Sequence, residues 1–269
     1  LKGKERVLIT QIRGCYNMPL VMSNKPNEKY RLTCESRSMC TETGHSVLVQ
    51  SHLGRDNRTL VFSLPYLKEL IPVGIVLRAL DCGDLRVPLG MPKKHDNADL
   101  ERYLRLIERD TSCTPTREDA IAYISALVVS DRRDELESSE FAQKILQHEI
   151  LPHLGLNSSS LERSFFLGAM VRRLLCTACG LREEDDRDDY TYKRVEPAGI
   201  LCYDLFRTLY KRYQANLVAA LEKKKQYLDV MTQIGRCNLI TQGMRHCFTT
   251  GNWGAQKNCS YVRAGVSQI

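Results

Sequence analysis

One segment in the last third of the chain repeats leucine or tyrosine at every fourth position. The repeat runs from Leu201 to Leu221, within residues 197–234. Since an α-helix has 3.6 residues per turn, such positions share one helical face. Pro197 suits the first turn, where the amide hydrogen that proline lacks is not needed. The pattern predicts one long helix, which must bury this face against another part of the fold.

Strands are expected at the other end of the chain. Short apolar runs with β-branched residues occupy residues 5–12, 45–53 and 59–65, and turn-forming residues separate them. Helical periodicity replaces this pattern from Pro72 onward. It recurs in residues 72–80, 98–110, 117–129, 140–154, 160–180 and 238–250. The sequence therefore predicts an α+β fold, with strands early and helices late.

Capping residues indicate where some of these helices begin or end. Thr116 precedes a helical pattern with Asp119 three residues later, and Asn238 precedes the last one. Side chains of these types accept hydrogen bonds from the unpaired amides of a first turn. Gly251 follows the last pattern and can adopt the left-handed conformation that ends many helices.

The composition is that of an ordinary globular chain. Of 269 residues, 43% are hydrophobic and 26% charged, and no apolar run approaches the roughly 20 residues that span a bilayer. A net charge of +7 favours a polyanionic partner, although many proteins carry as much for solubility. The eleven scattered cysteines indicate reduced thiols in an intracellular protein. Because the chain starts at Leu1 rather than methionine, we expect an excerpt of a longer polypeptide.

Three motifs invite a metal-binding interpretation, and each has a simpler one. In HEILPH, His148 and His153 are five residues apart with a proline between them, whereas zinc proteases need histidines four apart on one helix. Cys176 and Cys179 form the only CxxC motif, and a zinc ribbon needs two. The acidic residues 183–189 could hold Mg²⁺ through converging carboxylates. Packing thiols, a helix end and a charged surface turn are the favoured interpretations.

The stretch from Thr249 to Ile269 is the most distinctive. It contains the only tryptophan, Trp253, between glycines that allow tight backbone geometry. Donor side chains beside an aromatic ring suit phosphate and sugar oxygens of nucleic acids. The donors are those of Gln256, Lys257 and Arg263, with Tyr261 between them. On the residues alone, a tryptophan-anchored loop and a nucleic-acid contact are equally good interpretations.

Taken together, several segments resemble one family, the second-largest subunit of multisubunit DNA-dependent RNA polymerases. TGNWGAQK at residues 250–257 and RAGVSQ at 263–268 match one pattern of that family. DDRD at 185–188, KR at 193–194 and AG at 198–199 match another. Further segments resemble the lobe domain and the strand before it: residues 63–80, 144–155, 164–175 and 7–17. The likeness covers essentially the whole chain in the family's order and is greatest to the RNA polymerase II type.

The resemblance implies a multi-domain layout. Residues 1–20 would end the first protrusion segment, and residues 21–185 would form a lobe of mixed α and β structure. Residues 186–250 would return into the protrusion as helices, and residues 251–269 would begin the fork. The acidic segment then becomes a junction between lobe and protrusion rather than a metal site.

The resemblance also implies a function. The subunit takes part in template-directed RNA synthesis from NTPs, and this excerpt would form one side of the DNA cleft without being catalytic alone. The Mg²⁺ of the enzyme and the zinc of the subunit would be held outside the excerpt. Expected partners are template DNA, the RNA–DNA hybrid, the largest and other polymerase subunits and general transcription factors, with no membrane. The expected location is the nucleus, or a viral factory or virion for a large DNA virus.

Site residues follow from the fork pattern. Lys257 and Arg263 match its basic positions and, with Gln256, would contact the nucleic-acid backbone. The residues that would shape the loop are Gly251, Trp253, Gly254 and Gly265. Asn258 stands where the family often has lysine, which removes one phosphate contact.

An alternative of another class is a free-standing module with the lobe fold that binds transcription factors. Continuation of the reading frame into the rest of the fork would exclude it.

Overall fold

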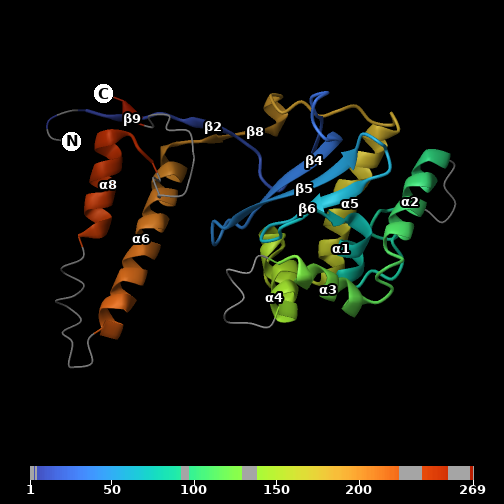
Figure 1. Ribbon diagram of the computed structural model, residues 1–269. Coiled ribbons are helices and arrows are strands. Elements are labelled where there is room, and N and C mark those ends of the chain that lie inside the picture. Colours follow the sequence, from blue (N-terminus) through green and yellow to red (C-terminus); the bar gives the residue numbers. More distant parts are fainter. Residues whose placement is uncertain are drawn as a thin grey trace. The chain divides into compact units, whose positions relative to one another are not determined.

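The computed structural model describes residues 3, 5–91, 97–128, 138–223, 238–253 and 267–268. The chain forms two compact units. One comprises Cys15–Asp189, and the other combines Leu1–Gly14 with Tyr190–Ile269. Helices and antiparallel strands occur in both (Figure 1), so the α+β class expected from the sequence is confirmed.

A five-stranded antiparallel sheet runs through the unit Cys15–Asp189. Neighbouring strands in the sheet are also consecutive in the chain, so only turns and short loops connect them. The strands are β3 (Leu20–Ser23), β4 (Tyr30–Met39), β5 (Ser46–Gly54), β6 (Leu60–Ser63) and β7 (Ile71–Pro72). Alternate residues of β5, such as Val47, Val49 and Leu53, are buried, as expected for a sheet with one covered face.

The longest strand, β4, is not among the strands expected from the sequence. Four of its buried alternate positions carry Leu32, Cys34, Ser36 and Ser38. Because two of these are serines, the apolar alternation that signals a strand is weak. Antiparallel pairing with β5 over nearly its whole length places the segment in the sheet.

Helices cover one face of this sheet (Figure 1). The longest of them, α5 (Ser160–Ala178), contacts β3, β4 and β5. Its core-facing residues, among them Leu167, Met170 and Leu174, are fully buried. The shorter helices of the unit are α1 (Val73–Ala79), α2 (Ala98–Asp110), α3 (Arg117–Ala126) and α4 (Ser138–Lys144).

Helix ends show where local sequence signals suffice. The cap predicted at Thr116 is confirmed: its hydroxyl accepts the Asp119 amide at 3.1 Å, and the Asp119 carboxylate accepts the Thr116 amide at 3.2 Å. Helical periodicity over residues 140–154 is interrupted, and the helix end expected within HEILPH is confirmed. There α4 passes into a π-helical turn, η2 (Ile145–Glu149), and a separate 3₁₀ turn, η3 (Pro152–Leu154), follows. Proline cannot continue the ladder of helical hydrogen bonds, which explains the break.

Two strand pairs and two helices make up the other unit. β1 (Val7–Leu8) pairs with β9 (Ser267–Gln268), and β2 (Gln11–Gly14) pairs with β8 (Lys193–Glu196), both antiparallel. The run expected as one strand over residues 5–12 is thus divided between two strand pairs. The 3₁₀ turn η4 (Tyr190–Tyr192) precedes β8, and the helices are α6 (Ala198–Lys223) and α8 (Leu239–Thr250).

The long helix predicted from the leucine repeat is α6, confirmed as far as Lys223; residues 224–237 lie outside the described part. Leu205 and Leu209 are 3% and 9% exposed, whereas Leu221 is 37% exposed, so only the first half of the stripe is buried. Gly243 of α8 lies against Leu209, because a Cβ there would come within 2.4 Å of Leu209 Cδ2. Asn238 precedes α8 as expected, but its side chain makes no capping hydrogen bond, so that part of the prediction is wrong.

Gly168 allows α5 to approach the loop before α2. A Cβ at this position would lie 2.0 Å from the carbonyl oxygen of Pro88. We expect Gly168→Ala to lower the free energy of unfolding by about 1–3 kcal/mol, the usual cost of overpacking, as measured by urea denaturation. The control is Gly83→Ala, where nothing lies within 4 Å of a Cβ. Equal stabilities of the two variants would contradict the close approach.

Candidate nucleic-acid interface

The distinctive stretch begins where α8 ends. Gly251 adopts the left-handed conformation, with φ 73°, and its amide donates to the Cys247 carbonyl at 2.8 Å. The predicted glycine stop is therefore confirmed. Because Gly251 is in the left-handed conformation, the helix ends there, and the chain changes direction before Trp253.

Trp253 is held in place by a polar and an apolar contact. Its indole Nε1–H donates to the Leu201 carbonyl at 2.8 Å, and its ring meets Phe248 edge-to-face at 5.1 Å between centroids. It also packs against the small core that Leu205, Leu209 and Cys247 form. Trp253 thus ties the end of α8 to the first turn of α6.

The remaining predicted loop and contact residues lie outside the part of the chain that the structure describes. They are Gly254, Gln256, Lys257, Arg263 and Gly265. Of the predicted set, the structure describes Gly251 and Trp253, which are two residues apart at the base of the loop.

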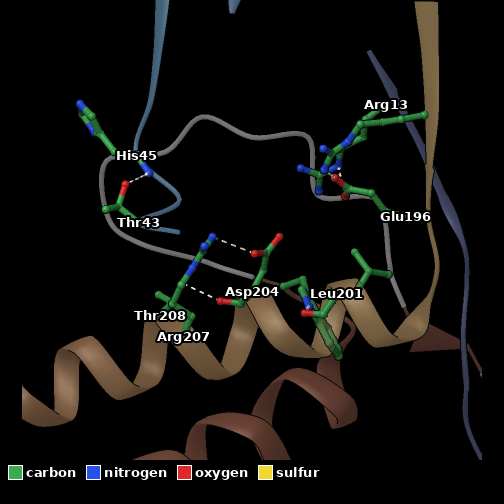
Figure 2. A network of polar contacts seen from close by, with 10 residues as sticks. Arg13, Thr43, His45, Glu196, Leu201, Asp204, Arg207 and Thr208 are labelled. Atoms are coloured by element: carbon green, nitrogen blue, oxygen red, sulfur yellow. Dashed lines mark hydrogen bonds and ion pairs between the residues drawn. The ribbon is translucent and has the colours of Figure 1, made fainter. Parts of the chain in front are cut away.

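A buried carboxylate stands at the start of α6. Glu196 is 1% exposed, and its Oε2 lies 2.9 Å from Arg13 Nε on the paired strand. Arg194, which lies opposite Arg13 in the register, binds the other carboxylate oxygen. Figure 2 shows Arg13 and Glu196 directed toward each other. The two guanidinium groups balance the buried charge and leave a net positive charge at this strand pair.

Sequence reasoning missed Glu196. The only signal was its position at the end of β8, two residues after Arg194 and directly before Pro197. The Pro197 carbonyl accepts the amides of Ile200 and Leu201. One turn further along α6, Arg207 pairs with Asp204 at 2.8 Å (Figure 2). The Arg207 guanidinium also lies 5.2 Å from the centre of the Tyr203 ring. Polar and aromatic side chains on the first turns of α6 therefore hold one another in place through these contacts.

The acidic segment 183–189 serves as an edge of the sheet in its own unit. The Asp185 amide donates to the Val21 carbonyl, and Asp185 Oδ2 accepts the Val21 amide, both at 2.8 Å. Glu184 accepts the Ser23 amide at 3.2 Å, and Arg182 pairs with Asp185 at 2.5 Å. These carboxylates are engaged by backbone amides and an arginine. Among the described residues, no three His, Cys, Asp or Glu side chains converge as metal ligands.

The other two motifs are explained by packing. His153 Nδ1 lies 2.7 Å from the buried Ser38 hydroxyl, its ring meets Phe166 edge-on, and burial lowers the pKa of His153. Cys176 and Cys179 are free thiols at the end of α5. Cys179 packs against the core, and burial raises the pKa of this thiol.

Among the described helices, none combines the length and the apolar character needed to cross a membrane.

Comparison with known proteins gives the family. Residues 16–196 match the family model of RNA polymerase Rpb2, domain 2. The chain belongs to the RNA polymerase Rpb2 family. The resemblance found in the sequence motifs is thereby confirmed.

The relatives of this family member come from viruses and cellular organisms. Over its whole length the chain is 36% identical to a probable DNA-directed RNA polymerase II subunit RPB2 homolog of Invertebrate iridescent virus 6, covering 25% of that protein. It is 33% identical to the DNA-directed RNA polymerase II subunit RPB2 of Meyerozyma guilliermondii and 30% identical to that of Eremothecium gossypii, covering 23% of each. The chain thus spans about a quarter of the length of these relatives.

Gly251 offers a test of the base of the loop. We expect Gly251→Ala to destabilise this unit by about 1–2 kcal/mol, since a side chain is strained at positive φ, and Gly251→Asn to cost less. Urea unfolding followed by fluorescence of Trp253, the only tryptophan, would measure it. Gly199→Ala is the matched control, because a Cβ there meets nothing within 4 Å. An unchanged midpoint for Gly251→Ala would contradict the left-handed cap.

Asp185 offers a test of the acidic segment. Its side chain is 4% exposed, and Asp185→Ala removes both the acceptor of the Val21 amide and the carboxylate that pairs with Arg182. We expect a loss of about 2 kcal/mol in the free energy of unfolding, typical of unsatisfied buried polar groups. Glu183→Ala, an exposed change of equal charge, is expected to stay within about 0.5 kcal/mol. Equal losses in both variants would show that charge, and not the amide contacts, matters.

Proposed function

We propose that this chain is part of the second-largest subunit of a DNA-directed RNA polymerase, which joins NTPs into RNA on a DNA template. The observation that carries the proposal is the match of the entire chain to RNA polymerase II subunits and their viral homologs. Because the chain spans only a quarter of those proteins, the activity belongs to the assembled enzyme and not to this part alone.

The layout that we propose follows the two compact units. Residues 21–185 are the lobe, and residues 1–20 and 186–250 belong to the protrusion. The unit boundaries at residues 15 and 189 support this division, and so does the family match over residues 16–196. The paired strands β2 and β8 join the two protrusion segments. In the full enzyme, lobe and protrusion would form one side of the DNA cleft, where cations follow phosphates without reading sequence.

The residues after α8 would form the start of the fork. We propose that Gln256, Lys257 and Arg263 bind the backbone of the RNA–DNA hybrid, and that Gly254 and Gly265 shape the loop that carries them. The net charge of +7 favours a polyanionic ligand. The contacts of Trp253 with Leu201 and Phe248 provide a fixed base from which this loop can start.

The metals and partners of the full enzyme would lie largely outside this chain. Mg²⁺ would supply charge neutralisation at the reacting phosphates, and a structural zinc would be held elsewhere in the subunit. Asp185 and Glu184 are engaged by backbone amides, which supports a structural rather than a metal-binding role here. The proposed partners are the largest and other polymerase subunits, template DNA, the hybrid and general transcription factors. The proposed location is the nucleus, or a viral factory or virion for a viral enzyme, in line with relatives from yeasts and from iridescent viruses.

The proposed function can be tested in a reconstituted polymerase whose second subunit contains this chain. We expect this enzyme to make RNA only in the presence of a template. With Lys257→Ala and Arg263→Ala, we expect the enzyme to retain the hybrid less tightly. The dependence of this retention on salt concentration should also be smaller, because each lost phosphate contact reduces the salt slope by about one. Elongation complexes would be challenged with rising salt, and the released RNA measured.

Arg105→Ala on the exposed face of α2 is the charge-matched control. Retention that is unchanged in the Lys257 and Arg263 variants at every salt concentration would contradict the fork contact. An assembled enzyme that makes no RNA would contradict the function itself.

A further inference from the structure

Two loops meet at one end of the five-stranded sheet. Residues 24–29 connect β3 with β4, and residues 55–59 connect β5 with β6. Arg55 joins them, because its guanidinium donates to the Glu28 carbonyl at 2.7 Å and to the Lys25 carbonyl at 2.5 Å. Arg31, at the start of β4, donates to the Asn57 side chain at 3.0 Å. The two loops are thus held together by side chains rather than only by the sheet.

This end of the sheet is strongly basic. Residues 25–31 and 55–58 contain five cations and two acids, and all five cations are exposed: Lys25, Lys29, Arg31, Arg55 and Arg58. None of them is in an ion pair with another residue of the described ranges. Asp56 is engaged by the Arg58 and Thr59 amides, which lower its pKa. Glu184, which accepts the Ser23 amide at 3.2 Å, is a further acid close to this end of the sheet.

A pair of stacked rings lies beside these cations. The Tyr30 and His52 rings are 4.7 Å apart between centroids with 24° between their planes, and both residues are half-buried. Lys29 Nζ lies 5.5 Å from the centre of the Tyr30 ring. Both rings therefore present aromatic surface next to positive charge.

Hydrogen bonds fix the orientation of the ring pair. Asn24 Nδ2 donates to Thr33 Oγ1 at 2.7 Å, and Thr33 Oγ1 lies 2.9 Å from His52 Nδ1. The Thr33 hydroxyl therefore fixes the His52 ring through Nδ1. Burial lowers the pKa of His52, which favours the neutral ring. The ring pair is thus an uncharged surface set in place before any ligand arrives.

We propose that this end of the sheet binds single-stranded nucleic acid, with phosphates at Lys29, Arg31 and Arg58 and a base stacked on Tyr30. Cations that follow the backbone beside an aromatic platform are the usual means of binding single strands. Lys29 would exchange its contact with the ring for a phosphate and so open the ring to a base. The inference takes its biological setting, a polymerase that separates DNA strands, from the proposed function, but its residues are separate from Lys257 and Arg263.

An acidic protein segment is the competing ligand for the same cations. It would satisfy the charges but gain nothing specific from the stacked rings. A duplex would likewise use the cations only, because its bases are already stacked on each other. The ring pair therefore distinguishes a single strand from both.

The test measures binding of a fluorescent 20-nucleotide single strand and of the matching duplex to the 269-residue chain by anisotropy at several salt concentrations. Lys257→Ala and Arg263→Ala are present throughout, so that the fork cannot dominate. We expect the triple variant Lys29→Gln, Arg31→Gln, Arg58→Gln to bind the single strand roughly ten-fold more weakly and to reduce the salt slope by about two. Tyr30→Leu should weaken binding of the single strand about five-fold or more and leave the duplex unchanged.

The control carries the same charge change at exposed arginines elsewhere in the unit: Arg105→Gln, Arg109→Gln and Arg117→Gln. If this control loses as much affinity for the single strand, the proposal is overturned, because the overall positive charge and not this site would then explain the binding. An equal effect of Tyr30→Leu on both DNAs, or tighter binding of a polyglutamate peptide than of the single strand, would also overturn it. Because RNA synthesis is not measured here, failure of this site and failure of the polymerase function give different results.

Discussion

β2 and β8 are paired although the whole unit Cys15–Asp189 lies between them in the sequence. Closing so long a loop costs conformational entropy, which the strand pairing and the ion pair of Arg13 with buried Glu196 must offset. Once the two strands are paired, Pro197 and the first turn of α6 follow directly. Trp253 then reaches the Leu201 carbonyl in that same turn, so the base of the proposed fork depends on the pairing as well.

Polar residues that suggest a catalytic or metal site in the sequence make hydrogen bonds within the folded chain instead. Asp185 accepts the Val21 amide at the sheet edge, and His153 lies against the buried Ser38 hydroxyl. Buried polar groups must find hydrogen-bond partners, and acidic or imidazole side chains near an edge strand or a helix end readily supply them. The basic loops at the end of the sheet differ, since their cations are exposed and their acids are fewer.

The predictions from sequence succeeded where structure is local. Helices such as α2 and α6 have strong periodicity, and the Thr116 cap and the Gly251 stop depend on neighbouring residues alone. The predictions failed where the structure of a segment depends on residues that are distant in the sequence. β4 has serines on its buried face and is a strand because β5 pairs with it. The predicted contact residues Lys257 and Arg263 come from a resemblance and lie outside the described residues, so they stay predictions.

By itself, the sequence determined the α+β class, the positions of most helices and membership in a polymerase family. Periodicity, capping residues and ordered motifs are properties of short segments, so they can be read without a structure. Only the tertiary structure decided that Glu196 is buried between two arginines and that residues 24–29 meet residues 55–59 beside the Tyr30–His52 pair. These arrangements depend on groups brought together by strand pairing, and their charge, burial and partners exist only once the chain has folded.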